Sequence, residues 1–177
     1  METLLEQITH ELMTPETKTS LAREVVRQWM TSPDLEVMGA VFRLLHKPEH
    51  YSRITPPLRF EDYQRFHVNY YERCLRENPE GVWCDSRYTA AHSLVVWFKG
   101  LWSDKTVSRD ALRELKSLLA RLYRDGDEKL KVAVITGALE HLFTDSTIVR
   151  FFADWKDDPE LKAAYFEALG YADTEQS

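Results

Sequence analysis

The sequence contains little cysteine and little glycine. Its two cysteines, Cys74 and Cys84, are too few for a disulfide framework and form no CxxC motif, so we expect reduced, partly buried thiols in a reducing compartment. The six glycines form no cluster that could wrap around a phosphate group. These two shortages argue against a disulfide-stapled secreted domain and against a nucleotide-binding loop.

Long apolar runs and a surplus of positive charge are absent as well. No stretch approaches 18 consecutive apolar residues, and the first twelve residues carry three glutamates where a signal peptide would carry bases. We therefore expect a cytoplasmic protein without a membrane span. The formal net charge of −6 argues against nucleic acid as a direct partner, because phosphate binding needs clustered lysine and arginine.

The six histidines form no recognisable metal-ligand pattern. His46 and His50 have the four-residue spacing of a helical metal site, but Pro48 interrupts the helix between them, so we predict two loop histidines and no metal. His10 begins a sequence similar to the zinc-protease motif, but Thr14 stands where the second histidine would be.

Other reactive residues are equally isolated along the sequence. Glu140 and His141 are neighbours in one apolar helix, where their side chains point about 100° apart and cannot share a site. Cys84 precedes a helix start that could lower its pKa, but no base stands near it in the sequence, and we interpret it as structural. We predict no catalytic residue, no cofactor and no metal, and therefore no enzyme.

The spacing of the apolar residues is helical almost throughout. It predicts an all-α fold without strands, a single irregular multi-helix domain over residues 1–177, in which a break near residue 58 would separate sub-layers 1–58 and 59–177. Short loops favour antiparallel neighbours and would permit stacking as helix pairs. The expected helices, about nine in number, cover residues 4–12, 15–30, 33–45, 60–78, 85–102, 108–124, 128–143, 146–155 and 160–169.

Cap residues and prolines mark several of the expected helix ends. Thr14-Pro15 and Ser32-Pro33 each combine an N-cap residue with a proline at the first helical position. Gly170 is expected to end the last helix. Three prolines forbid a continuous helix over residues 46–59, which we interpret either as a plain connector or as a functional loop.

Residues 85–102 are apolar on most sides. A helix of this kind is typically a central, buried one. From this pattern we predict that Leu94, Trp97 and Trp102 belong to the core, together with Leu139 of a later helix.

The negative charge is concentrated in residues 144–177. This stretch holds eight acids and three bases, which accounts for −5 of the net charge of −6. One interpretation is a surface for a basic protein partner, with an aromatic anchor; the other is helix capping plus an acidic tail, with the aromatic residues all inward. The candidate partner-binding residues are Asp145, Asp154, Trp155, Asp157, Asp158 and Glu160.

Five segments of the C-terminal half carry a resemblance. They are Arg87–His92, Trp97–Trp102, Thr136–Phe143, Phe151–Trp155, and Asp158–Leu161 followed by Ala164-Tyr165. In these segments the chain resembles a family of small bacterial proteins that are often encoded beside polymorphic toxins and are thought to act as immunity proteins. The resemblance implies a helical, non-enzymatic inhibitor that binds one cognate toxin inside the cell.

The sequence therefore predicts a non-enzymatic protein-binding protein. A nuclease-like toxin would be basic because it binds phosphate, and an acidic inhibitor would suit it. The alternative is a general helical adaptor or regulatory subunit of another protein complex, which needs only the helical fold and the aromatic content of 12%.

Overall fold

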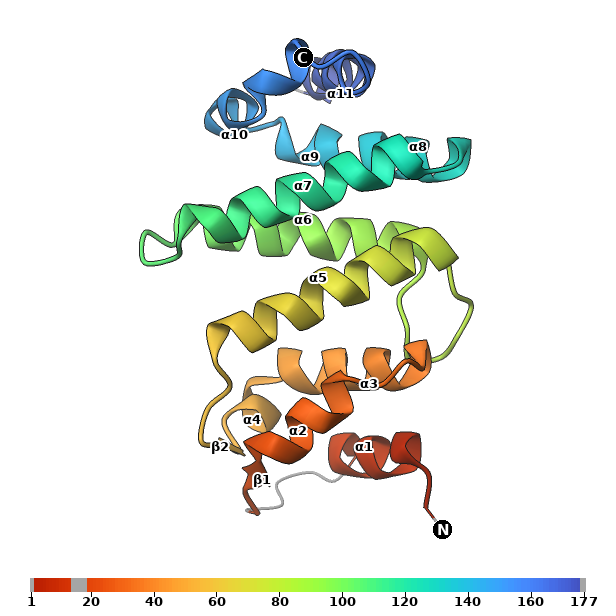
Figure 1. The fold of residues 1–177 in the computed structure, drawn as a ribbon, viewed down its shortest axis with the longest axis vertical. Coiled ribbons are helices and arrows are strands. Elements are labelled where there is room, and N and C mark those ends of the chain that lie inside the picture. Colours follow the sequence, from red (N-terminus) through yellow and green to blue (C-terminus); the bar gives the residue numbers. More distant parts are fainter. Residues whose placement is uncertain (1, 14–18, 176–177) are drawn as a thin grey trace. The chain divides into compact units, whose positions relative to one another are not determined.

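The chain folds into helices and two very short strands in the computed structural model, which describes residues 2–13 and 19–175 (Figure 1). The predicted all-α fold is confirmed, although the expectation of no strand at all is wrong. The chain forms two compact units, residues 1–74 with 78–86 and residues 75–77 with 87–177. The change of unit thus falls later than residue 58, and whether both units fold as one domain stays a prediction.

The first unit is built around a buried helix, α3. The apolar residues of α3 face α1 and α2, and its Phe42 ring stacks on Tyr70 of α5 with ring centres 4.4 Å apart. The elements of this unit are α1 (Leu4–Met13), β1 (Leu21–Ala22), α2 (Arg23–Met30), α3 (Leu35–His46), α4 (Pro48–Tyr51), β2 (Ile54–Thr55) and α5 (Phe60–Glu77), of which the last turn belongs to the second unit.

The two strands take the place of part of the expected second helix. Leu21 pairs in parallel with Ile54, and its backbone N–H donates to the carbonyl oxygen of Arg53 at 2.9 Å. These bonds hold the backbone extended, so α2 begins only at Arg23. The predicted cap at Thr14-Pro15 lies outside the described residues.

Two further boundaries differ from the sequence prediction. Residues 46–59 contain α4 and β2 and are therefore not a continuous irregular loop. Asp34, rather than Ser32, is the N-cap of α3, because its carboxylate accepts the backbone N–H of Glu36 at 2.9 Å.

The second unit is a series of helices that pack on their neighbours in sequence. Helix α7 packs on both α6 and α8, which also contact each other. The elements α8, η1 and α9 follow without a break as the helix expected over residues 128–143 (Figure 1). The elements are α6 (Arg87–Ser103), α7 (Arg109–Asp125), α8 (Glu128–Val134), the π-helical turn η1 (Ile135–Leu139), α9 (Glu140–Leu142), α10 (Ser146–Phe151), the 3-10 turn η2 (Ala153–Lys156) and α11 (Lys162–Glu175).

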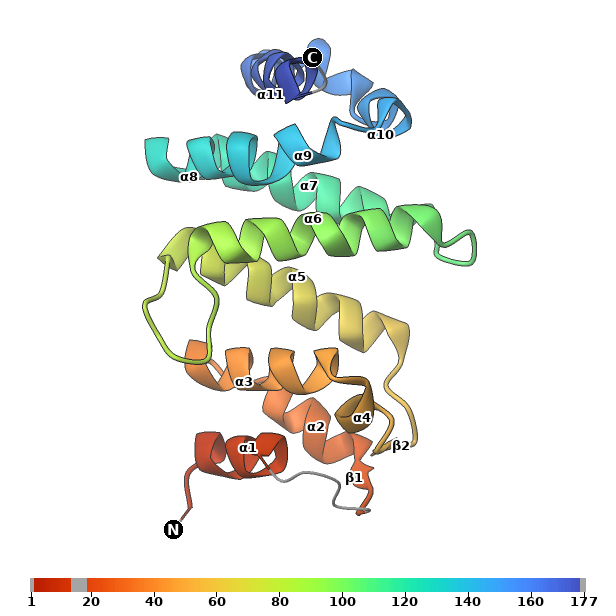
Figure 2. The same ribbon diagram turned by 180° about the vertical axis from the view of Figure 1, so that it is seen from behind.

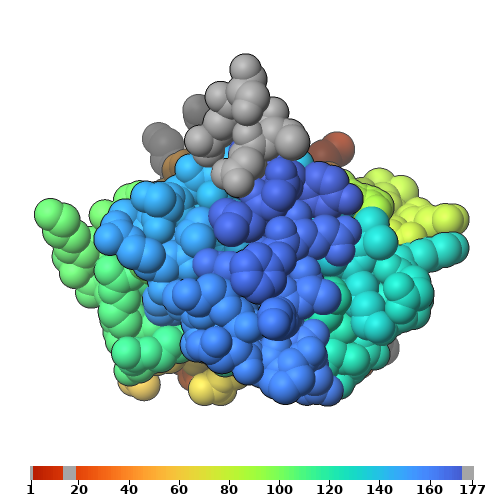
Figure 3. Space-filling model, turned by 90° about the horizontal axis from the view of Figure 1, so that it is seen from above, coloured from red at the N-terminus to blue at the C-terminus, as the bar shows by residue number. Residues whose placement is uncertain are grey.

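The last helix is longer than expected. It continues past Gly170 to Glu175, because Gly170 does not adopt the positive φ with which a glycine ends a helix. Together, α10, η2 and α11 cover one end of the second unit and appear in blue in Figure 3.

The core of the second unit corrects two of the four predicted core positions. Leu94 and Leu139 are fully buried, but Trp97 and Trp102 are only half-buried. Trp102 lies at the edge, where its indole N–H donates to Thr147 Oγ1 at 3.2 Å and the Arg109 guanidinium lies 4.2 Å from its ring centre. In the part of the chain that the structure describes, no helix is long and apolar enough to cross a membrane.

Candidate functional site

Three of the six candidate residues line a hollow of about 550 Å³ in the second unit. It is bounded on one side by α7 and on the other by residues 151–161. The lining residues are Arg113, Lys116, Ser117, Ala120, Arg124, Phe151, Asp154, Trp155, Asp158 and Leu161. The period of about 3.6 residues brings the α7 members of this set to one helix face, so that their bases point toward the acids of the opposite wall.

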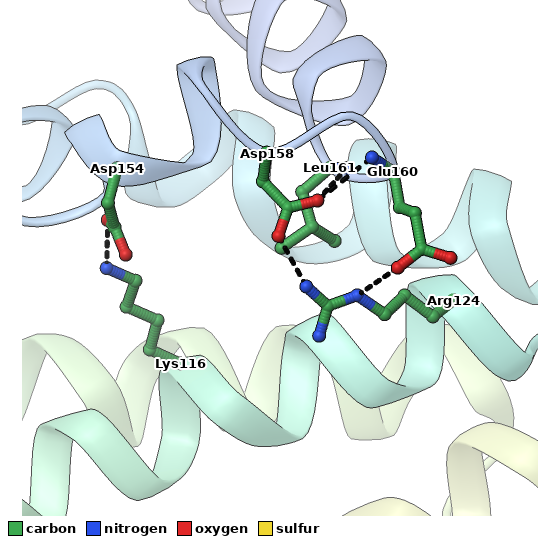
Figure 4. A network of polar contacts seen from close by, with 6 residues as sticks. All are labelled: Lys116, Arg124, Asp154, Asp158, Glu160 and Leu161. Carbon is green, nitrogen blue, oxygen red and sulfur yellow. Dashed lines mark hydrogen bonds and ion pairs between the residues drawn. The ribbon is translucent and has the colours of Figure 1, made fainter.

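The acids of this hollow are paired with bases of α7. Asp154 binds Lys116, whose ammonium group also donates to the carbonyl oxygen of Phe151 at 2.8 Å. Arg124 binds Asp158 at 2.5 Å and the neighbouring Glu160 at 3.0 Å (Figure 4). Three of the five candidate acids thus meet two bases, so part of the negative charge predicted for this surface is compensated within the molecule.

Two of the candidate acids also accept backbone N–H groups at or shortly before the start of a helix. The Asp158 carboxylate accepts the N–H groups of Glu160 at 2.9 Å and Leu161 at 3.2 Å, and these bonds, together with Arg124, lower its pKa. Asp145 is the N-cap of α10 and accepts the backbone N–H and the hydroxyl of Thr147, which lower its pKa. Capping therefore explains part of the acid pattern.

Trp155 does not present its ring to solvent. It is 2% exposed and packs edge-on against Phe152 with ring centres 5.0 Å apart, so the proposed role as an aromatic anchor is wrong. The side chains of Asp154 and Glu160 remain 70% and 69% exposed, and Asp157 is exposed too. These acids are accessible to a partner, and their role in binding stays a prediction.

A second surface was not foreseen and lies on α6. Tyr88 is 55% exposed, Val96 is 60% exposed, and His92 between them is exposed as well. With Gly100 these residues follow one another at intervals of four and form one stripe, which we call the α6 stripe. It carries no acid, and the only base on the outer part of the helix, Lys99, donates to Thr144 Oγ1 at 3.2 Å.

Helix α6, which carries the stripe, packs against η1 and α9 (Figure 2). A Cβ atom at Gly137 would lie 2.9 Å from the Ala91 Cβ, so glycine permits this close approach of η1 to α6. One turn further on, the rings of His92 and His141 lie with their centres 6.3 Å apart. The sequence contained a signal for this surface, because residues 85–102 are apolar on most sides. The apolar sides of such a helix are buried either in the protein's own core or against a partner.

The remaining candidate residues have structural surroundings. The prediction of two loop histidines is wrong, because His46 ends α3 and His50 lies in α4. His46 is exposed and its Nδ1 lies 2.9 Å from the carbonyl oxygen of Phe42, whereas His50 is buried, which lowers its pKa. Both cysteines are free and buried. Burial, followed by the hydrogen bond to Glu36, raises the pKa of Cys84 to about 11, opposite to the lowering expected from a helix start.

No group of three or more histidine, cysteine and acidic side chains in the described ranges is arranged to hold a metal ion. Comparisons with protein-family models, with curated proteins and with solved structures each found no match.

Proposed function

We propose that the chain is a non-enzymatic protein-binding protein, and specifically an immunity protein that binds and neutralises a cognate bacterial toxin in the cytoplasm. The observation that carries protein binding is the α6 stripe, because its exposed Tyr88 and Val96 side chains gain free energy when a partner removes them from water. The resemblance of the C-terminal half to immunity proteins supports the toxin as that partner.

The exposed carboxylates of the second unit support a basic toxin. Asp154 and Glu160 keep more than half of their side-chain surface in water although each is paired with a base. Such groups steer a positively charged domain toward the surface and exchange internal ion pairs for intermolecular ones. A nuclease-like toxin, which must be basic to bind phosphate, has the charge that this surface attracts.

A general helical adaptor is the second candidate function. It is favoured by the α6 stripe, which carries no carboxylate, lysine or arginine and therefore does not by itself select a basic partner. Affinity purification separates the two: recovery of a housekeeping complex without a toxin would support the adaptor.

The test of the immunity function is co-expression with the product of the neighbouring gene. We expect that product to stop growth and the wild-type chain to restore it. If the neighbouring product is harmless, or the wild-type chain gives no protection, the immunity proposal is wrong.

The role of the α6 stripe is tested in the same assay by Val96→Glu. A carboxylate in the middle of the stripe must be desolvated on binding, so protection should be lost while the circular dichroism spectrum is unchanged. Val25→Glu is the matched control, because Val25 is an equally helical valine, 42% exposed, in the first unit. Protection by Val96→Glu equal to that by Val25→Glu would move the interface away from α6.

A further inference from the structure

Two histidines from different helices meet on the surface of the second unit. The ring centres of His92 in α6 and His141 in α9 lie 6.3 Å apart, with the ring planes at 84°. His92 is exposed and His141 is half-exposed. Among the described residues neither imidazole takes part in a hydrogen bond or an ion pair, so the ring nitrogens of both histidines are left for another ligand.

We propose that His92 and His141 form a two-histidine site for a divalent transition-metal ion. Imidazole nitrogen suits zinc, nickel and copper, and it does not suit magnesium or calcium, which prefer oxygen. Two imidazoles on one tetrahedral ion, at about 2.1 Å per nitrogen, have ring centres about 5 Å apart. The observed separation closes by about 1 Å when both side chains rotate slightly, which two surface rings do readily.

The surroundings leave the remaining coordination positions to water. The charged groups beside the pair on the same helices are Lys99 and Glu140, which are opposite in sign. Lys99 is held by Thr144 Oγ1, whose own hydroxyl donates to the carbonyl oxygen of His141. The site is therefore an open one with two protein ligands, one fewer than a catalytic zinc site has, and unlike a closed structural one.

This site does not depend on the proposed immunity function. His92 lies on the α6 stripe, however, so the open coordination positions of a metal held there would face a partner that covers the stripe. Binding of the metal alone is the property to be measured.

The experiment is calorimetric titration of tag-free protein with nickel and with zinc at pH 7.5. We expect one equivalent of each to bind. His92→Asn and His141→Asn should each weaken binding about tenfold or more, because even loss of an outer partner of a ligand costs about 10–100-fold. His10→Asn, which removes an exposed histidine of the first unit, should leave the affinity unchanged.

Nuclear magnetic resonance of the wild-type chain provides a test without substitutions. Paramagnetic nickel should broaden the ring signals of His92 and His141 together, at lower nickel concentration than those of His10 and His46. Equal broadening of all exposed histidines would overturn the proposal, and so would unchanged affinity in either of the two variants.

Discussion

Glu36 connects the third helix of the first unit to the loop that follows α5. Its carboxylate accepts the backbone N–H groups of Val82 at 3.2 Å, Trp83 at 3.3 Å and Cys84 at 3.2 Å. The Cys84 thiol also donates to it, at 2.8 Å. One acid thus satisfies three consecutive backbone donors that water or secondary structure would otherwise have to satisfy.

The pH dependence of stability should show this role of Glu36. Burial raises its pKa, but the hydrogen bonds from the Cys84 thiol and the loop N–H groups outweigh burial and lower it. A carboxyl with a lowered folded-state pKa stabilises the fold above its unfolded-state pKa of about 4.3 and loses this contribution as the pH falls through the folded value. Glu36→Gln should therefore lower the free energy of unfolding at pH 7 by about 1–3 kcal/mol.

Urea unfolding of both chains at pH 7 and at pH 3 checks this prediction. The difference between wild type and Glu36→Gln should shrink at the lower pH, because the contribution of the charged carboxylate falls once the pH is below the unfolded-state pKa and approaches the lowered folded-state pKa. Glu80→Gln, an exposed acid in the same loop, is the control and should change little. A constant difference at both pH values would contradict the assignment of the effect to the charge.

At the scale of the element, the two glycines of the second unit's α6 and η1 have opposite surroundings. A Cβ at Gly137 would meet the Ala91 Cβ at 2.9 Å, whereas a Cβ at Gly100 would meet nothing within 4 Å. Alanine is the better helix former at either position by about 0.5–1 kcal/mol. Packing therefore decides whether alanine stabilises or destabilises the fold at Gly137, and helix propensity decides it at Gly100.

We predict that Gly137→Ala destabilises the protein and Gly100→Ala does not. Overpacking at Gly137 should cost about 1–3 kcal/mol, more than the gain in propensity. Gly100→Ala should be neutral or stabilise the fold by up to about 1 kcal/mol. Thermal unfolding of the two variants gives the comparison, and a stabilised Gly137→Ala would show that η1 moves away from α6 at little cost.

Helix positions were predictable from the sequence where apolar spacing and local caps agree. The helices α5 and α7 begin and end within two residues of the expected limits, and Ser108 caps α7 as its position before the apolar run suggests. The β1–β2 pair was not predictable, since Leu21 and Ile54 meet only through tertiary contacts, and a two-residue strand leaves no periodic signal.

At the scale of the whole molecule, the sequence showed where charge is concentrated but not how it is compensated. Asp154, Asp158 and Glu160 stand together in the sequence, and they do gather around one hollow. Lys116 and Arg124, which pair with them, lie more than 30 residues earlier, and local spacing says nothing of such partners. The α6 stripe was missed for a related reason. The spacing of apolar residues shows that the helix is apolar on more than one side, but it does not show which of these sides the rest of the fold covers.

The net charge of −6 is expected to act on association with a basic partner over distances longer than a contact. Asp154→Lys combined with Glu160→Lys changes the charge of the exposed surface beside the hollow by four units. It should slow association with a verified basic toxin domain and reduce the dependence of the association rate on salt, because rim charges act mainly on encounter. The measurement is stopped-flow association at several salt concentrations.

The substituted acids also hold Lys116 and Arg124, so the variant's fold has to be compared with that of a control. Glu61→Lys with Glu80→Lys makes the same change of net charge at two exposed acids of the first unit. If steering acts through Asp154 and Glu160, only their double variant slows association strongly, while both double variants retain the wild-type circular dichroism spectrum. Equal slowing in both variants would mean that the partner responds to the net charge of the chain and not to the acids beside the hollow. Unchanged association rates in both variants would contradict steering by these acids and leave the α6 stripe as the candidate binding surface.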